Sequence, residues 1–458
     1  MSRLIVVSNR VPLPDEHGSA PAGGVAIALK AALKQKKGFW MGWSGKVKSE
    51  AAPAALIPRE IDGISYQLVD LSQKDLDEYY HGFANRVLWP IFHGRPDLAE
   101  YTEARRSGYY HVNQMFAGLL KSLLREDDVI WVNDYHLIPL AEELRQAGVR
   151  NRIGFFLHIP WPPADILSTV PMYATLLCGL SAYDLVGFHT DYDLSNFNEC
   201  LEREQQGETV EQRSRAVDEN KSRCAVFPIS IDTANFESLA EQAARGERLQ
   251  KAYPRIAGYD IAIGVDRLDY SKGIEKRIGA FGAFLRRYCQ RVDKTLLLQI
   301  TPKSRGVIPA YLAIQKEIAE LVGRVNGEFG TIDWVPVHYI HKPVRHSELA
   351  GLYRKARIGL VTPLRDGMNL VAKEYVAAQD PLDPGVLILS RFCGAAREMK
   401  SAMQVNPYDT EEMARTIEEA LIMRLEDRIE RWNAMMTTLR THDVHHWCDE
   451  FLRSLNES

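Results

Sequence analysis

The stretch Ile261-Ala-Ile-Gly-Val-Asp-Arg267 runs from apolar residues directly into charged ones. A short, continuous apolar run of this kind is typical of a parallel β-strand that is buried on both faces. The charged residues then fall at the carboxyl end of the strand, which is where open parallel sheets bind their ligands. This segment therefore predicts both a buried strand and one edge of a binding site.

Similar apolar runs recur along the chain, and longer segments with helical spacing separate them. The other runs are Leu4–Val7, Val129–Val132, Ile153–Leu157, Leu185–Phe188, Thr295–Ile300, Gly359–Val361 and Val386–Leu389. The helical segments include Ala26–Gln35, Asp134–Ala147, Lys276–Arg287 and Ala310–Val322. Alternation of strand and helix predicts a doubly wound α/β fold. Since one sheet seldom holds so many strands, we expect two similar Rossmann-like domains.

The boundary between the domains is expected near Pro228–Glu237, after the polar stretch Arg203–Arg223. We therefore predict a first domain over residues 1–232 and a second over residues 233–435. From Glu411 onward the tail has a helical pattern throughout. The sequence allows the last helix, about residues 436–458, to pack back onto the first domain, and it does not decide the matter.

Composition excludes several classes of protein. The 458 residues are 46% hydrophobic and 25% charged, the balance of a folded globular chain and not of a disordered one. A net charge of -4 gives no basic surplus for nucleic acid. Six cysteines without a Cys-x-x-Cys pair indicate free thiols in a reducing compartment. With neither a signal-peptide core nor an apolar run near the roughly 20 residues of a membrane span, we expect a cytoplasmic protein.

Polar residues gather where the predicted strands end. Six ends carry them: Ser8–Arg10, Asn133–His136, His158, Asp266–Gly273, Lys303–Arg305 and Arg365–Asn369. Polar residues that simply begin loops would explain one or two of these ends, but not the same bias in all six. The pattern therefore favours a ligand-binding cleft between the two domains.

Four basic residues, Arg10, Arg267, Lys272 and Arg305, each follow a strand end. Phosphates need charged donors on rigid elements, so these side chains could hold two phosphorylated ligands. Gly23 and Gly24 precede a helical run, where exposed N–H groups favour an anion, although paired glycines are often only a turn.

The run from Asp366 to Glu374 is the most informative single motif. Asp366 is expected in a loop, and the helix is expected to begin at Leu370. Free N–H groups of Leu370 and Val371 could then meet a diphosphate, while Glu374 could accept from vicinal hydroxyls. A plain N-capped helix is the alternative.

Other candidates have weaker patterns. Tyr80 and Trp89 could stack on a sugar or pack in the core, and His158 could bond a sugar hydroxyl or be structural. No group of His, Cys and carboxylate residues has the spacing of metal ligands, so we expect no metal and no cofactor.

Taken together, these strings resemble a known family, the trehalose-6-phosphate synthases of glycosyltransferase family 20, over nearly the whole chain. The matching motifs are Ser8–Arg10, Ala22–Gly24, Trp40–Gly45, Leu88–Pro90, Asp134–Leu137, Phe156–Pro160, Arg267–Gly273 and Arg365–Glu374. The resemblance implies a GT-B fold, in which two Rossmann-like domains face each other across a cleft. It implies transfer of glucose from UDP-glucose to glucose 6-phosphate with retention, giving α,α-trehalose 6-phosphate and UDP.

The resemblance also assigns residues to each substrate. Arg10, Tyr80 and Arg305 correspond to contacts with the acceptor's phosphate, and Trp89 and Asp134 to contacts with its sugar. Gly23, Gly24, His158, Arg267, Lys272 and Asp366 correspond to contacts with the donor's glucose and phosphates. The nucleotide is assigned to Val344, Asn369, Leu370, Val371, Ala372, Lys373 and Glu374, with Glu374 on the ribose. The expected catalytic residues are His158, Arg267, Lys272 and Asp366.

The family's mechanism implies attack from the front face, in which the departing phosphate takes the acceptor's proton. We therefore assign no general base and no nucleophile. The resemblance further implies a homo-oligomer, dimer or tetramer, and a separate phosphatase acting on the product.

Two positions depart from the family pattern. Asn133 stands where His commonly precedes Asp-Tyr-His-Leu, and Val344 stands where some relatives have an aromatic residue beside the base. The second departure leaves uracil or guanine open as the preferred base. Two other functions stay open: transfer to another phosphorylated acceptor, such as glycerol 3-phosphate, and a non-catalytic sugar-phosphate sensor.

Overall fold

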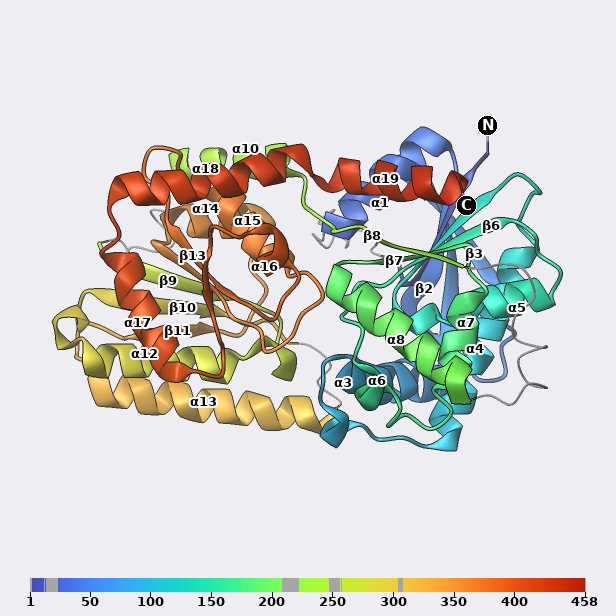
Figure 1. Cartoon of the computed structure of the whole chain (residues 1–458), viewed down its shortest axis with the longest axis horizontal. Coiled ribbons are helices and arrows are strands. Elements are labelled where there is room, and N and C mark those ends of the chain that lie inside the picture. The colour runs from blue at the N-terminus through green and yellow to red at the C-terminus, as the bar shows by residue number, and fades with distance from the viewer. Residues whose placement is uncertain are drawn as a thin grey trace. The chain divides into compact units, whose positions relative to one another are not determined.

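The computed structural model describes residues 2–11, 13, 24–207, 222–246, 256, 258–303 and 308–457. They divide into two units (Figure 1). The first comprises Met1–Ile229 with His445–Ser458, and the second comprises Ser230–Val444. Each unit holds a largely or wholly parallel sheet between helices, which confirms the predicted α/β fold of two Rossmann-like domains.

The sheet of the first unit has the strand order β3-β4-β2-β1-β5-β6-β7-β8. Only β3 runs antiparallel to its neighbour; the other pairs are parallel. The strands are β1 (Leu4–Arg10), β2 (Phe39–Lys48), β3 (Leu56–Ile61), β4 (Ile64–Ser72), β5 (Val129–Asn133), β6 (Arg152–Phe156), β7 (Leu185–Phe188) and β8 (Arg223–Val226).

Helices cover both faces of this sheet, with α1 and α19 on one face and α4, α5, α7 and α8 on the other (Figure 1). Their bounds are α1 (Gly24–Lys36), α2 (Gln73–Asp75), η1 (Leu76–Leu88), α3 (Trp89–Phe92), η2 (Pro96–Leu98), α4 (Glu103–Lys121), η3 (Tyr135–Leu137), α5 (Leu140–Gln146), α6 (Ala164–Leu167), α7 (Ala174–Ser181), α8 (Asp191–Gly207) and α19 (Val444–Asn456). The segment η1 is a π-helix. This form is rare in proteins overall, and where it occurs it is often found at functional sites.

The sheet of the second unit is wholly parallel, in the order β11-β10-β9-β12-β13-β14. Its strands are β9 (Asp260–Val265), β10 (Thr295–Ile300), β11 (Val337–Ile340), β12 (Ile358–Val361), β13 (Val386–Ser390) and β14 (Met403–Val405). Its helices are α10 (Thr233–Arg245), η4 (Tyr270–Lys272), α12 (Ile274–Arg287), η5 (Cys289–Arg291), α13 (Pro309–Phe329), α14 (His346–Lys355), α15 (Leu370–Ala378), α16 (Ala395–Glu398), α17 (Thr410–Leu421) and α18 (Leu425–Thr441).

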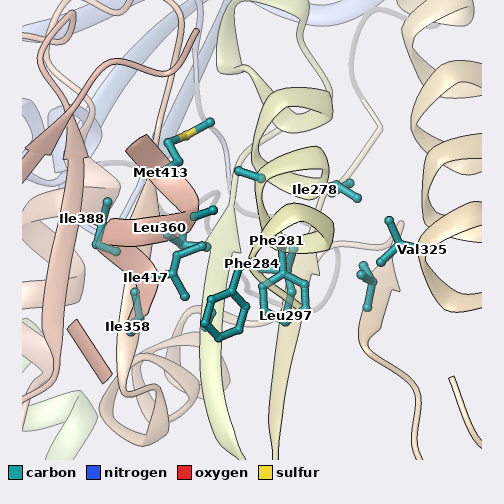
Figure 2. Packing of buried hydrophobic residues seen from close by; sticks show 14 of the residues in the cluster. Ile278, Phe281, Phe284, Leu297, Val325, Ile358, Leu360, Ile388, Met413 and Ile417 are labelled. Carbon is teal, nitrogen blue, oxygen red and sulfur yellow. The ribbon is translucent and has the colours of Figure 1, made fainter. Parts of the chain in front are cut away.

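The core of the second unit forms where α12, α13 and α17 cover one face of the sheet (Figure 2). On α12, Ile278, Phe281 and Phe284 follow helical spacing and are buried against the sheet. Val325 of α13 and Ile417 of α17 join the same cluster. The apolar stripe of the α12 sequence is thus the part of the helix that anchors it.

Helix α19 packs against the sheet of the first unit, although it ends the chain. The rings of Trp447 and Phe451 lie 5.1 and 4.4 Å from that of Trp131 in β5. Gly187 in β7 gives the helix room, because a Cβ there would lie 2.9 Å from Phe451 Cε2 and 2.7 Å from Phe156 Cδ2. Strands from the first half of the sequence and its last helix therefore share one core.

Two helical predictions need correction. The segment Asp134–Ala147 does not form one helix, because Asp134 has a φ of 79° and α5 begins only after Pro139. The tail from Glu411 is not helical throughout either. It breaks between α17, α18 and α19, where the backbone leaves the helical region at Arg424 (ψ 151°) and at His442 (ψ 68°).

Candidate active site

The two sheets each have one point at which the strand order reverses, and ligands bind α/β sheets at such points. In the first unit the reversal lies between β1 and β5, which end beside Arg10 and Asp134. In the second unit it lies between β9 and β12, which lead into Arg267 and Asp366. The polar residues singled out in the sequence therefore stand at both reversal points.

An aromatic cluster joins Arg10 to Tyr80 in the first unit. The exposed Arg10 guanidinium lies 5.5 Å from the centre of the Trp43 ring, and that ring lies 5.7 Å from Tyr80. Tyr80, which is partly exposed on η1, stacks on His136 at 5.8 Å and 15°. The structure thus brings together the cation at the end of β1 and a phenol from the π-helix.

Trp89 belongs to the same aromatic cluster from its buried side. Its ring lies 4.1 Å from His93 and 5.7 Å from Tyr135, and Tyr135 in turn lies 3.9 Å from His136. Only 4% of Trp89 is exposed, so it shapes the wall of the cluster and offers little open surface.

Asp134 and His158 meet after the neighbouring strands β5 and β6. The Asp134 N–H donates to the Phe156 carbonyl at 2.8 Å, and the His158 N–H donates to Asp134 Oδ1 at 3.3 Å. The His158 ring packs beside Phe156 and Trp447. Desolvation by these neighbours lowers the pKa of His158 to about 3, so its imidazole is neutral at any ordinary pH.

Lys272 and Asp366 form the centre of the site in the second unit. The Lys272 ammonium is paired with Asp366 Oδ2, which also accepts from Asn369 Nδ2 at 3.0 Å. Both charged side chains are mostly buried, with 14% and 13% exposed. A partly buried cation of this kind is suited to a phosphate, because it is already held in place before the ligand arrives.

The loop that carries Lys272 is fixed by tight local bonds. Gly273 follows with a φ of 61°, and a Cβ there would lie 2.7 Å from the Thr362 carbonyl. The Leu364 N–H, from the loop after β12, donates to the Ser271 carbonyl at 2.8 Å. The loops after β9 and β12 are thus joined by backbone as well as by charge.

Arg267 lies on the same loop, with 45% of its side chain exposed. Its Nε is 4.0 Å from Oδ2 of Asp269, which is fully buried. Asp269 is held in turn by the Ser271 hydroxyl at 2.9 Å and the Tyr311 hydroxyl at 2.9 Å. The backbone of Arg267 is therefore held by this loop, while its guanidinium reaches solvent.

The helix α15 begins at Leu370, as predicted, with Asn369 as N-cap residue at a φ of 74°. Glu374 lies in its second turn, and its Oε1 is 3.9 Å from His346 Nε2. Lys373 points the other way: its buried ammonium is 2.7 Å from Glu398 Oε2, and burial lowers its pKa. Any contact of Lys373 with a ligand would therefore come from its backbone.

For the four remaining candidates the structure shows few contacts or none. Val344 is partly buried in the loop before α14, and Gly24 begins α1. Gly23 and Arg305 lie outside the described residues. Within the described ranges no group of three His, Cys, Asp or Glu residues could hold a metal ion. None of the helices in those ranges combines the length and the apolar character that a membrane span requires.

Comparison with known proteins decides the family. The family model described as glycosyltransferase family 20 matches residues 2–457. The chain belongs to glycosyltransferase family 20. The trehalose-6-phosphate synthase of Sinorhizobium fredii is 54% identical over 100% of this chain and 99% of its own length.

Solved structures of family 20 enzymes have the same fold as this chain. A UDP-forming α,α-trehalose-phosphate synthase of Burkholderia xenovorans, in complex with glucose-6-phosphate, has a TM-score of 0.92 and 43% identity, covering 99% of this chain and 100% of its own. An Escherichia coli enzyme bound with UDP-2-fluoro glucose has a TM-score of 0.91 and 41% identity, covering 100% and 99%. The family 20 likeness confirms the GT-B class expected from the sequence.

The sequence did not single out Arg277, which lies beneath this family 20 site. Arg277 is 1% exposed, and its guanidinium reaches Asp266 Oδ2 at 2.7 Å, Gln299 Oε1 at 3.1 Å and Thr362 Oγ1 at 3.0 Å. These partners come from the ends of β9, β10 and β12. The available signal was its spacing, since Arg277 falls on the apolar stripe of α12 beside Ile274 and Ile278.

Proposed function

We propose that this chain is a retaining glycosyltransferase that moves glucose from UDP-glucose to glucose 6-phosphate and gives α,α-trehalose 6-phosphate and UDP. The observation that carries the proposal is the match to trehalose-6-phosphate synthases over the full chain, at 54% identity. Two relatives of known structure were solved with glucose-6-phosphate and with UDP-2-fluoro glucose.

We assign the acceptor to the aromatic cluster of the first unit. Arg10 supplies an exposed cation and Tyr80 a phenol for the phosphate of glucose 6-phosphate. Asp134 supplies an acceptor for the sugar's hydroxyls, and its unusual backbone is held by the bond to Phe156. Trp89 shapes the wall, and Arg305 is assigned to the same phosphate from the sequence.

We assign the nucleotide and the diphosphate of the donor to the second unit. Arg267 and Lys272 bind the diphosphate, since both cations follow the same strand and their loop is fixed by Asp269 and Gly273. The backbone N–H groups of Leu370 and Val371 add donors at the start of α15, whereas the Ala372 N–H already donates to the Asn369 carbonyl at 3.3 Å. Glu374 accepts from the ribose, and Val344 is assigned to the base. Asp366 and Asn369 orient Lys272. The glucose is assigned to Gly23, Gly24 and His158, which belong to the first unit.

The chemistry follows from where charge develops. Cleavage of the glycosidic bond builds negative charge on the departing UDP, which Arg267 and Lys272 stabilise more strongly in the transition state than in the ground state. We propose front-face attack, in which the acceptor's proton passes to the leaving phosphate. The anomeric configuration is then retained without a carboxylate nucleophile.

Three associated points remain predictions from the sequence. Transfer needs no metal, the chain forms a homo-oligomer, and a separate phosphatase acts on the product. The cytoplasmic location and the cleft between the domains are predictions of the same kind.

UDP release with a panel of acceptors tests the proposal. We expect UDP from UDP-glucose with glucose 6-phosphate, and little with glycerol 3-phosphate or with no acceptor. UDP release with glycerol 3-phosphate but not with glucose 6-phosphate would show that glycerol 3-phosphate is the acceptor. Binding of glucose 6-phosphate, with no release of UDP, GDP or ADP from UDP-, GDP- or ADP-glucose, would instead indicate a sensor.

A further inference from the structure

The side chain of His158 is bonded to that of Asn133, the last residue of β5. His158 Nε2 lies 3.0 Å from Asn133 Oδ1. Asn133 is 3% exposed, and it pairs with Phe156 of β6, two residues before His158. Asn133 is therefore placed by a strand, and His158 lies two residues past the end of the neighbouring strand.

A second bond fixes which end of the Asn133 amide faces the ring. Asn133 Nδ2 donates to the Trp131 carbonyl at 3.3 Å. Turning the amide over would set Oδ1 against that carbonyl, where neither oxygen can donate. The oxygen therefore faces His158, and because this oxygen only accepts, Nε2 of the ring must be the donor.

The ring carries a single proton. The rings of Phe156, His189 and Trp447 lie 4.8, 5.8 and 6.2 Å from it, and desolvation lowers the pKa of His158 to about 3. The titratable groups that face it are His189 and Asp134, and Asp134 already accepts from the His158 N–H. A neutral imidazole protonated at Nε2 has a lone pair on Nδ1.

In the part of the chain that the structure describes, Nδ1 of His158 bonds to no protein atom, and protein atoms do not enclose it completely. The residue is partly exposed, so this nitrogen is open to a ligand.

We infer that Asn133 is a positioning residue, which holds His158 in the Nε2–H tautomer so that Nδ1 accepts a hydrogen bond from a hydroxyl of the donor's hexose. The inference rests on the proposed function for the identity of the hexose. It makes His158 an acceptor that orients the sugar and excludes it as an acid, because the ring has no proton to give from Nδ1.

Ring nitrogen NMR on the free protein tests the tautomer without turnover. In a ¹⁵N-histidine sample, the His158 signals, assigned with His158→Gln, should show protonated Nε2 and bare Nδ1 at neutral pH. Protonated Nδ1, or a ring that titrates near its ordinary pKa, would overturn the inference. Because this measurement needs no substrate, it is independent of the proposed reaction. If the proposed function itself were wrong, the parent protein would show no turnover of UDP-glucose with glucose 6-phosphate.

Two variants test the function of the bond. Asn133→Leu removes the acceptor, and we expect kcat/KM for UDP-glucose to fall roughly 10- to 100-fold, as for a lost hydrogen bond at a buried site, with the KM for glucose 6-phosphate unchanged. Asn133→Asp keeps an acceptor but adds a charge that raises the pKa of His158. Its activity should approach that of the parent at high pH and fall as the pH is lowered.

A purely structural role for Asn133 predicts equal losses in both variants and no new pH dependence, which would overturn the inference. Asn196→Leu is the matched control, since Asn196 is also buried in this unit and donates to the Trp161 carbonyl. It should keep the parent's kcat/KM. If Asn133→Leu does not fold, the NMR spectrum and the Asn133→Asp pH profile decide the matter.

Deoxy analogues of the donor identify the hydroxyl. One UDP-deoxyglucose analogue lacks the hydroxyl from which Nδ1 accepts. On that analogue the parent and Asn133→Leu should have the same kcat/KM, because the hydrogen bond is already absent. If the variant lost the same factor on every analogue, His158 would bind no donor hydroxyl.

Discussion

The ammonium of Lys272 and the carboxylate of Asp366 form an ion pair between two loops that are 94 residues apart in the chain. The pair joins the ends of β9 and β12 at the point where the strand order reverses. A cation held in this way keeps its position without a ligand, while its charge is only partly neutralised by a carboxylate that also accepts from Asn369. The arrangement suits a group whose task begins when negative charge grows on a leaving phosphate.

Lys272→Ala should therefore act on turnover. We expect kcat to fall about 10²–10³-fold, the loss typical for removal of one group that stabilises developing charge, while the KM for glucose 6-phosphate stays near that of the parent. Steady-state UDP release measures both. Lys276→Ala, an exposed lysine on α12, is the control and should leave both constants unchanged. An unchanged kcat in Lys272→Ala would remove Lys272 from the donor site.

Arg10→Ala should act on binding of the acceptor. Loss of a charge-assisted hydrogen bond to phosphate is expected to raise the KM for glucose 6-phosphate roughly 10- to 100-fold, with a smaller change in kcat. Arg10→Lys should recover part of the loss, because it keeps the charge but not the planar fork. Arg59→Ala, an exposed arginine on β3, serves as control. If only the KM for UDP-glucose moved, the acceptor would have been placed in the wrong unit.

Arg277→Met should act on stability, because it leaves Asp266 buried without its partner at 2.7 Å. Breaking a buried pair from one side costs about 3–5 kcal/mol of the free energy of unfolding, measured by urea titration. Arg286→Met on the same helix removes an exposed pair with Glu328 and should cost less than about 1 kcal/mol. Equal small effects in both variants would show that the buried network does not hold the strand ends.

The sequence predicted the buried strands well, because each is a short apolar run that ends in polar residues. It missed β3, β4, β8, β11 and β14, which lie at or next to the edges of the sheets, and also β2, which lies beside β1. Edge strands such as β3, with Pro58, Arg59 and Glu60 exposed or partly exposed, lack the continuous apolar signal. The π-helix was also missed, since its turn length leaves no mark on the composition.

At the candidate site, the sequence could place charges at strand ends but not decide which way a side chain points. Lys373 stands in the same motif as Glu374, yet its ammonium is paired with Glu398 in the interior. Arg277 and Asn133 act through other residues, so their importance depends on contacts between β9, β10 and β12 or between β5 and β6. Such contacts are long-range and cannot be deduced from local spacing.

The close packing of α19 on the sheet of the first unit predicts that a side chain at Gly187 would destabilise the fold. Gly187→Ala should lower the free energy of unfolding by about 1–3 kcal/mol, because its Cβ would lie 2.7 Å from Phe156 and 2.9 Å from Phe451. Gly118→Ala on α4 meets no atom within 4 Å and should instead add about 0.5–1 kcal/mol through helix propensity. A neutral Gly187→Ala would mean that α19 leaves this surface readily.

The most direct test of the proposed function is to identify the product made from UDP-glucose and glucose 6-phosphate in the presence of EDTA. We predict stoichiometric UDP and a disaccharide phosphate whose NMR spectrum shows an α,α-1,1 linkage, at a rate that EDTA does not change. A β configuration at the transferred glucose would contradict retention at the donor, and loss of activity in EDTA would contradict stabilisation of the leaving UDP by Arg267 and Lys272 alone. The absence of any disaccharide phosphate would contradict the proposed transfer itself.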